Sequence, residues 1–366
     1  MQRRQFLRDS LTLGSGLVIG FHLPVKSVMG QEPPAPENFP PNAFVRIASD
    51  NTVTVISKHT EMGQGVYTGL ATMMAEELDA DWSQMRVEAA PANVALYRHL
   101  LLGIQGTGGS MSVPNAWMQY RTVGATARAM LVAAAAKQWK VPAADITVSK
   151  GVVSHASGKS AAFGELADAA GKLEVPTGVA LKDPSQFTLI GTRVPKLDVP
   201  AKVNGTAMFT IDVRRPNMKV AVIKHSPRFG GKLVAFDATA ARAVSGVVDV
   251  IQIPTGLAVI ADTTFAAFRA RDLVTAEWDF SNAENRGTDE IVRDFTALTE
   301  QPGMSVQKEG DSAAAITANA ARTLDATYVF PFLAHACMEP LETTLELVGE
   351  KAYLRSGTQM QSIEQQ

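Results

Sequence analysis

The order of apolar and polar side chains divides the chain into patterned and unpatterned stretches. Period-two runs predict strands, and apolar side chains at helical spacing predict helices. In chain order the pattern predicts a hairpin over 44–58, a helix over 65–80, a strand over 85–91, a long Ala-rich buried helix over 112–139, a hairpin over 145–160 and a helix over 163–171. These elements predict one α+β unit over residues 42–175.

A second patterned block starts near Gly205, after a Pro-rich stretch at 176–202 that we interpret as a linker. β-rich runs predict strands at 206–213, 218–226, 247–254 and 256–263, and helical spacing is present at 236–246 and 265–279. We therefore expect a compact α+β domain over 203–281.

The last part of the chain carries a weaker pattern. Residues 282–325 are polar and predict irregular structure, whereas the apolar YVFPFL run, residues 328–333, predicts a buried strand in a third, strand-rich block. The sequence stops at SIEQQ without a terminating element. We therefore expect 282–366 to be the incomplete start of a further domain.

The N-terminus predicts an export signal over residues 1–30, followed by a linker over 31–41. Arg3 and Arg4 precede Phe6-Leu7 and an apolar run from Leu11 to Leu23, which is too short to span a bilayer. The paired arginines are typical of the twin-arginine route, so we expect a periplasmic protein. An uncleaved membrane anchor is the alternative, and cleavage and membrane association stay open.

Composition limits the chemistry that the chain supplies by itself. The net charge of -2, without a basic stripe, gives no indication of nucleic-acid binding. A single cysteine, Cys337, excludes a cysteine-ligated cluster held by this chain alone, and the six histidines show no metal-ligand spacing. Any redox centre must therefore be an organic or borrowed cofactor.

Two Gly-rich loops are candidate ligand sites. Gly63-Gln64-Gly65 lets the backbone approach a ligand closely, and the Gln64 amide offers a polar contact, with a plain tight turn as the alternative. Thr107-Gly108-Gly109-Ser110 precedes the long helix and suits an anion at its N-terminus, although Ser110 would equally serve as a simple cap. Two such loops in one unit favour a large phosphate-bearing ligand.

A third candidate is the segment HACMEP, residues 335–340. His335, Met338 and Glu339 follow the apolar run and would line a pocket there. A structural histidine and a capping glutamate are the alternative. Cys337 as a nucleophile lacks an identifiable base.

In this order, the twin-arginine signal, TEMGQGVYTGL, QGTGGSMSV, KVNGTAMFTIDV and HACMEP resemble the xanthine oxidase superfamily of molybdenum hydroxylases. The large subunits of isoquinoline 1-oxidoreductase and membrane-linked aldehyde dehydrogenase are most similar. The resemblance runs along nearly the whole chain and implies an α+β cofactor-binding unit, an α/β-hammerhead-like domain and the start of a further α+β cofactor-binding domain.

The resemblance implies a molybdopterin cytosine dinucleotide cofactor. Gly63, Gln64 and Gly65 match a loop near the pterin and molybdenum, and the TGGS loop, residues 107–110, matches a cofactor phosphate loop. His335, Met338 and Glu339 match the substrate pocket. No protein side chain is expected to ligate the metal.

The implied activity is hydroxylation of an aldehyde or N-heterocyclic carbon with water as oxygen source, assisted by a carboxylate base. Electrons would leave through [2Fe–2S] clusters on a small partner subunit, with a cytochrome c as a further acceptor. Family large subunits are about twice this length, and the expected glutamate base lies beyond residue 366. A truncated remnant that binds its partner without turnover is thus the alternative function, and an exported binding protein for a sugar phosphate is a third.

Overall fold

The computed structural model describes residues 16–20, 43–318 and 320–365. They form two compact units, which divide after Thr210 and after Pro340; the residues from Leu341 onward belong to the first unit. We expected boundaries at 202/203 and 281/282. Most of the expected signal and the whole linker over 31–41 lie outside the described residues.

The first unit is built on a sheet with strand order β1-β2-β3-β4. Its strands are β1 (Gly16–Gly20), β2 (Ala43–Ala48), β3 (Val53–Ser57) and β4 (Met85–Ala89). The hairpin expected around Asn51 is confirmed, because β2 and β3 pair antiparallel. β3 and β4 pair in parallel, which requires a crossover, and α2 (Val66–Leu78) supplies it.

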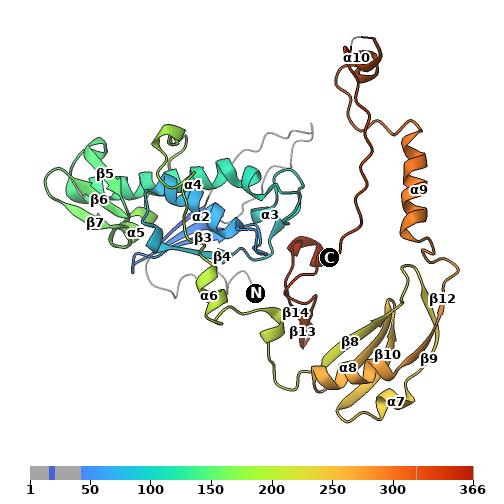
Figure 1. The fold of residues 1–366 in the computed structure, drawn as a ribbon. Coiled ribbons are helices and arrows are strands. Elements are labelled where there is room, and N and C mark those ends of the chain that lie inside the picture. Colours follow the sequence, from blue (N-terminus) through green and yellow to red (C-terminus); the bar gives the residue numbers. More distant parts are fainter. Residues whose placement is uncertain (1–15, 21–42, 319, 366) are drawn as a thin grey trace. The chain divides into compact units, whose positions relative to one another are not determined.

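Three helices pack on this unit: α2, α4 (Ser112–Trp139) and α5 (Phe163–Gly171), and all three were predicted from spacing. Figure 1 shows α4 alongside α2. Their backbones approach closely at Gly124, where a Cβ atom would lie 2.5 Å from the carbonyl oxygen of Met74. Phe44, Tyr97 and Tyr120 pack edge to face at the centre of the core.

Smaller elements complete the first unit. They are α3 (Val94–Tyr97), the sheet of β5 (Ile146–Ser149), β6 (Val152–His155) and β7 (Ser160–Ala162), the short α6 (Val199–Val203), the hairpin of β13 (Thr343–Val348) and β14 (Lys351–Ser356), and α11 (Gln361–Glu364). The hairpin expected over 145–160 is confirmed by β5 and β6.

The Pro-rich stretch at 176–202 is largely irregular, but it is bonded to α2. The Glu76 carboxylate accepts hydrogen bonds from the backbone N–H groups of residues 188–190 and from Lys182. Burial raises the pKa of Glu76, but these hydrogen bonds outweigh burial and leave it below its usual value. This buried carboxylate fastens the stretch to the first unit.

The second unit contains two small sheets. β8 (Val220–His225), β10 (Val247–Ile253) and β11 (Gly256–Ala261) form one with order β10-β11-β8, and β9 (Lys232–Asp237) pairs with β12 (Thr275–Asp279) in the other. Helices α7 (Thr239–Arg242) and α8 (Thr264–Leu273) accompany them.

Two predictions within residues 206–279 are wrong. Residues 206–213 form no strand and contain a 3-10 turn at Thr210–Asp212. The helix expected over 265–279 ends at Leu273, because its last residues form β12 and pair with β9. Residues 206–213 have β propensity but pair with no strand among the described residues. Residues 275–279 have helical spacing but pair with β9.

Two further predictions fail between 282 and 340. This stretch contains α9 (Thr288–Thr299) and α10 (Ser312–Ala318) where irregular structure was expected. Glu290 favours α9 by accepting a hydrogen bond from the Gly287 N–H. The YVFPFL run forms no strand; Phe330 and Phe332 are each 84% exposed. Pro331 lacks the N–H needed for pairing, and within the described residues no strand lies against the run.

Candidate functional site

The first Gly-rich loop is held by its own glutamate. One carboxylate oxygen of Glu61 accepts hydrogen bonds from the N–H groups of Gly63 and Gly65, at 2.9 and 2.8 Å, and the other accepts from Tyr67 N at 3.0 Å. Gly63 and Gly65 have φ of 102° and 93°, the left-handed region that favours glycine. The backbone N–H groups of Gly65 and Tyr67, at the start of this helix, are therefore already bonded to Glu61.

The Gln64 amide is also bonded inside the loop. Its oxygen accepts a hydrogen bond from Met62 N at 2.7 Å, and its nitrogen donates to the Thr60 carbonyl at 3.0 Å. The side chain is nevertheless exposed, so the amide lies at the surface of the turn. To contact a ligand with both polar atoms, Gln64 must exchange these two bonds.

The second Gly-rich loop differs in having unbonded N–H groups. Among the described residues, none accepts a hydrogen bond from the backbone N–H of Gly108, Gly109 or Ser110. Gly109 and Ser110 have φ of 62° and 57°, in the left-handed region, so the loop turns sharply just before α4. The residue that caps α4 is Met111, without a side-chain hydrogen bond, so Ser110 does not act as the cap.

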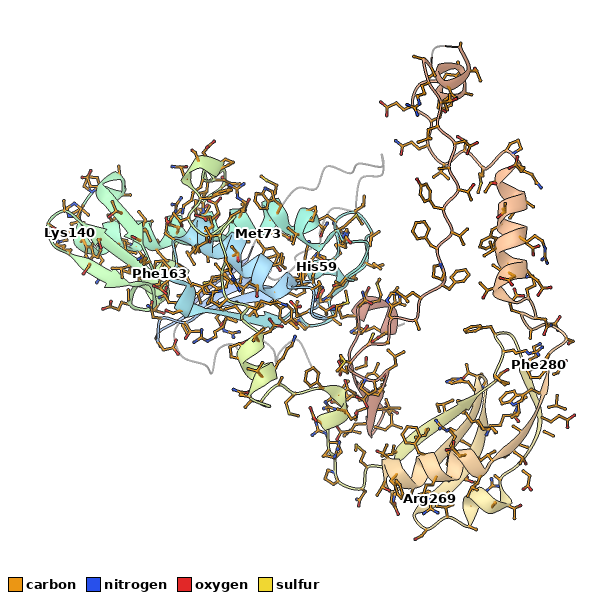
Figure 2. All side chains as sticks on the ribbon, viewed as in Figure 1. His59, Met73, Lys140, Phe163, Arg269 and Phe280 are labelled. Carbon is orange, nitrogen blue, oxygen red and sulfur yellow. The ribbon has the colours of Figure 1, made fainter. Side chains whose placement is uncertain are left out.

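The two loops lie side by side and are joined by hydrogen bonds. Thr107 Oγ1 accepts from the backbone N–H of Thr60 at 2.9 Å and from its hydroxyl at 3.2 Å. One residue earlier, His59 Nδ1 lies 3.1 Å from the carbonyl oxygen of Gly106. His59 and Thr60 lie two and three residues after the end of β3, so this end of the strand positions both loops; His59 is labelled in Figure 2.

The segment 359–362 packs under the second loop. The carbonyl of Gln359 accepts from Thr107 N at 2.7 Å, and its amide donates to the Thr107 carbonyl at 3.0 Å. Ser362 Oγ accepts from Gln105 N at 3.0 Å. A Cβ on Gly106 would lie 2.6 Å from Met360 Sδ, so the Met360 side chain packs directly against the Gly106 backbone. The sequence carries no signal for this pairing across more than 250 residues.

Lys58 is a buried cation beside the loops. Its side chain is fully buried, and among the described residues the ammonium has one hydrogen-bond acceptor, the Arg98 carbonyl at 3.5 Å, and no carboxylate. Burial lowers the pKa of Lys58 to about 7. The structure therefore carries an uncompensated, half-ionised group at neutral pH behind the first loop.

Two buried histidines accompany Lys58. The rings of His59 and His99 pack edge to face with centroids 5.6 Å apart. Burial, together with the Lys58 charge, lowers the pKa of His59 to about 4 and also lowers that of His99. His99 Nδ1 accepts from the N–H groups of Leu101 and Leu102, which places its proton on Nε2, a buried donor without a partner among the described residues.

The neutral state of His59 determines its tautomer. A carbonyl oxygen only accepts, so Nδ1 must donate to Gly106 and Nε2 must accept. The group of Asn115 that lies 3.3 Å from Nε2 must therefore be its amide nitrogen, which donates to the ring. His59 thus joins the second loop to the first turn of α4.

Lys196 lies over the first loop, although its segment reads as a linker in the sequence. Its ammonium donates to the Gly63 carbonyl at 3.0 Å, and its Cε would lie 3.5 Å from a Cβ on Gly65. Leu197 N donates to Thr68 Oγ1 and fixes this segment on α2. Glu61, Lys58 and Lys196 are therefore site residues that the motif alone did not indicate.

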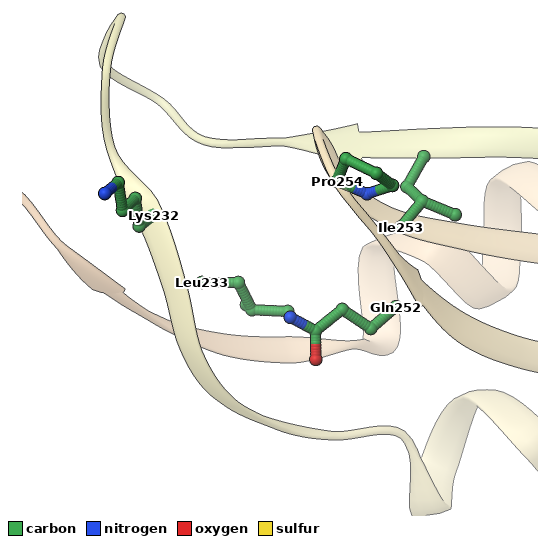
Figure 3. A pocket seen from close by; sticks show the side chains of 5 residues that line it. All are labelled: Lys232, Leu233, Gln252, Ile253 and Pro254. Atoms are coloured by element: carbon green, nitrogen blue, oxygen red, sulfur yellow. The ribbon is translucent and has the colours of Figure 1, made fainter.

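The HACMEP residues belong to the second unit. His335 and Met338 are exposed, Met338 at 99%, and Glu339 is half-buried. Their role in substrate binding stays a prediction. An open pocket of about 500 Å³ in this unit is lined by Lys232, Leu233, Gln252, Ile253 and Pro254 (Figure 3).

The described side chains contain no group of three or more His, Cys, Asp or Glu residues arranged to hold a metal ion. In the same part of the chain no helix is both long and apolar enough to cross a bilayer.

A family model, molybdopterin cofactor-binding domain, matches residues 2–225, which include both Gly-rich loops. The chain belongs to this family. The resemblance expected from the motifs is confirmed, and the family model supports the molybdenum cofactor that the resemblance implied.

Three curated relatives extend the comparison. The chain is 31% identical to the beta subunit of isoquinoline 1-oxidoreductase from Brevundimonas diminuta, over 85% of this chain and 45% of that protein. It is 33% identical to membrane-bound aldehyde dehydrogenase [pyrroloquinoline-quinone] of Gluconacetobacter polyoxogenes, over 76% and 37%. It is 26% identical to a subunit of nicotinate dehydrogenase from Pseudomonas putida, over 86% and 27%. The match spans less than half of each relative.

Among solved structures, quinoline 2-oxidoreductase from Pseudomonas putida 86 matches with a TM-score of 0.24 and 22% identity, over 37% of this chain and 17% of that one. The Cu,Mo-CO dehydrogenase matches with a TM-score of 0.21 and 17% identity, over 24% and 15%.

The residues present fit a phosphate-bearing cofactor at the second loop. Its unbonded N–H groups at Gly108, Gly109 and Ser110 lie at the N-terminal end of a 28-residue helix, where the helix dipole favours an anion. The first loop fits a polar, non-anionic part of the same molecule, because Glu61 already fills its donors.

Proposed function

We propose that this chain is part of the large subunit of a molybdenum hydroxylase, and that it binds molybdopterin cytosine dinucleotide across the two joined loops. The observation that supports this most strongly is the pair of hydrogen bonds from Thr60 to Thr107, which places an exposed Gln64 turn beside a loop with unbonded N–H groups. The cofactor, when bound, supplies the two-electron redox chemistry.

The proposed roles of the chain's residues follow from their donors. Gly108, Gly109 and Ser110 bind the dinucleotide phosphates through backbone N–H groups. Gln64 contacts the pterin and molybdenum side of the cofactor through its amide, and Gly63 and Gly65 allow close approach. His335, Met338 and Glu339 contribute to the substrate pocket.

The proposed reaction is oxidation of an aldehyde or an N-heterocyclic aromatic carbon, with water as the oxygen source. The names of the isoquinoline, aldehyde and nicotinate relatives support these substrate classes. With one cysteine in the sequence, the chain requires a small [2Fe–2S] subunit to remove the electrons, and a cytochrome c is a suitable further acceptor. Arg3 and Arg4 support periplasmic export by the twin-arginine route.

An isotope experiment tests the reaction. The chain is produced with its iron–sulfur partner in a host that makes the molybdenum cofactor, and dye-linked oxidation of benzaldehyde and of isoquinoline is measured in water enriched in ¹⁸O. The proposal predicts product that carries solvent ¹⁸O. Turnover by a quinone-containing, molybdenum-free preparation would contradict it.

A second candidate is a non-catalytic remnant that folds or binds its partner without turnover. The exposed YVFPFL run is the observation that favours it. If the chain is such a remnant, it binds its iron–sulfur partner but contains no molybdenum and shows no turnover. The first proposal predicts both molybdenum and turnover, so this measurement separates the two.

A further inference from the structure

Glu61 occupies the position that an anion would take at the start of α2. Its two carboxylate oxygens accept three backbone hydrogen bonds, from Gly63, Gly65 and Tyr67, at 2.8 to 3.0 Å. The first N–H groups of a helix have no partner within the helix, and the helix dipole favours negative charge there. The Glu61 carboxylate therefore satisfies donors that would otherwise bind a phosphate.

The start of α4 differs from the start of α2, because no carboxylate in the described part of the chain occupies its N–H groups. At the start of α4 the N–H groups of Gly108, Gly109 and Ser110 have no acceptor among the described residues, and the capping residue Met111 offers none. Both helices follow a Gly-rich loop, but only the α2 loop brings its own carboxylate. The second loop can therefore bind an anion through its backbone N–H groups, whereas the N–H groups of the first loop are already occupied by Glu61.

The contacts around the turn agree with a fixed geometry. On one side Glu61 holds the N–H groups, and on the other the Lys196 ammonium holds the Gly63 carbonyl. Gln64 lies at the exposed tip between them. Charge-assisted hydrogen bonds of this kind are stronger than neutral ones, so the turn keeps its left-handed glycines without a ligand.

We propose that Glu61 is a positioning residue: a built-in anion that holds the Gly63–Gln64–Gly65 turn in its ligand-receiving shape and keeps ligand phosphates away from the start of α2. The consequence for binding rests on the proposed function, whereas the effect on the turn does not. A phosphate-bearing ligand then has the second loop as its anion site, and the first loop contacts an uncharged part.

The test uses hydrogen exchange on the full chain purified without cofactor. In Glu61→Ala, exchange at the amides of Gly63, Gly65 and Tyr67 becomes at least about tenfold faster, because each loses a charged acceptor. Formate or inorganic phosphate, added as the probe, slows these amides again in Glu61→Ala and leaves the wild type unchanged. Glu61→Gln, which keeps one acceptor oxygen, gives intermediate exchange.

Glu165→Ala is the matched control. Glu165 accepts a hydrogen bond from Ala162 N at the start of α5, so the substitution removes a comparable contact at another helix of the same unit. Glu165→Ala is expected to accelerate exchange at the Ala162 amide alone. In this variant formate and phosphate are expected to leave exchange at residues 63–67 unchanged. Unchanged exchange at Gly65 and Tyr67 in Glu61→Ala, or no effect of either probe, overturns the proposal.

Molybdenum content separates this proposal from the proposed function. If the exchange results hold and Glu61→Gln retains more molybdenum than Glu61→Ala, both proposals are supported. If the exchange results hold but no variant and no wild-type protein contains molybdenum, Glu61 holds the turn and the proposed function fails.

Discussion

Thr60 donates two hydrogen bonds to the hydroxyl oxygen of Thr107, one from its backbone N–H at 2.9 Å and one from its own hydroxyl at 3.2 Å. The two residues are 47 positions apart; Thr60 precedes the first Gly-rich loop and Thr107 is the first residue of the second. Thr107 is buried, with 2% of its surface exposed, so few waters can replace it as the acceptor. This contact makes one site from two loops.

Replacing Thr107 tests the contact between the loops. Thr107→Val keeps the shape but removes the acceptor, and leaving the Thr60 N–H unpaired costs about 1–2 kcal/mol of unfolding free energy. Thr107→Ser keeps the oxygen and is expected to stay close to the wild type. Urea unfolding measures both, and equal stability of the Val and Ser variants would mean that the contact contributes nothing.

Lys58 is expected to lower the stability of the folded chain at neutral pH. Its pKa falls from 10.5 to about 7 on folding, so the unfolded chain binds more protons and stability rises as pH increases from about 7 to 10.5. Lys58→Met removes this dependence and raises the unfolding free energy at pH 7 by about 1 kcal/mol or more. Urea unfolding between pH 7 and 10 measures the change.

Lys182→Met is the matched control for Lys58. The Lys182 ammonium pairs with Glu76 at 3.0 Å and with Asp79 at 2.6 Å, so its removal leaves a buried carboxylate without a cation and costs roughly 3 kcal/mol. The two substitutions therefore change stability in opposite directions. A loss of stability in Lys58→Met similar to that in Lys182→Met would contradict our description of Lys58.

The lowered pKa of His59 predicts that the folded chain loses stability in mild acid. Its pKa falls from 6.5 to about 4 on folding, so the unfolded chain binds more protons in that window, and stability decreases as pH falls from about 6.5 to 4. The full difference is on the order of 3 kcal/mol. An NMR titration of the His59 ring measures its pKa directly, and a midpoint near 6.5 would show that the ring is not held neutral.

Gly124 tests the packing of α4 on α2. A Cβ there would lie 2.5 Å from the Met74 carbonyl oxygen, so Gly124→Ala must separate the helices and is expected to cost about 1–3 kcal/mol. Gly69, also helical, would place its Cβ 3.6 Å from Val113, an ordinary contact. Gly69→Ala is expected to be neutral or up to about 1 kcal/mol stabilising. Thermal unfolding of the pair measures the difference.

The local elements of the first unit could be predicted from sequence because their periodicity is strong. β2, α2 and α4 pack a face into the same core and β3 is buried along its whole length, so local pattern and tertiary packing agree there. The YVFPFL run shows the limit: its composition is that of a buried strand, but strand formation depends on a pairing partner elsewhere in the chain.

The candidate site was only partly predictable for a similar reason. Glycines and a glutamine mark the two loops locally, whereas the joining of Thr60 to Thr107 is a long-range contact with no local signal. The role of Glu61 was not predicted although it lies within the motif, because the pattern alone does not show which backbone N–H groups its carboxylate reaches. Checking for a carboxylate within reach of those groups would have found it.

The ratio of molybdenum to protein tests the central claim most directly. The full chain is purified with its partner from a host that makes the cofactor, and molybdenum is measured by mass spectrometry in the wild type, in Thr107→Val and in the control Thr147→Val, whose hydroxyl bonds within the β5–β6 hairpin. We predict stoichiometric molybdenum in the wild type and the control, and a clear loss in Thr107→Val. Molybdenum-free wild-type protein, or equal molybdenum in all three, would contradict a cofactor site formed by the two joined loops.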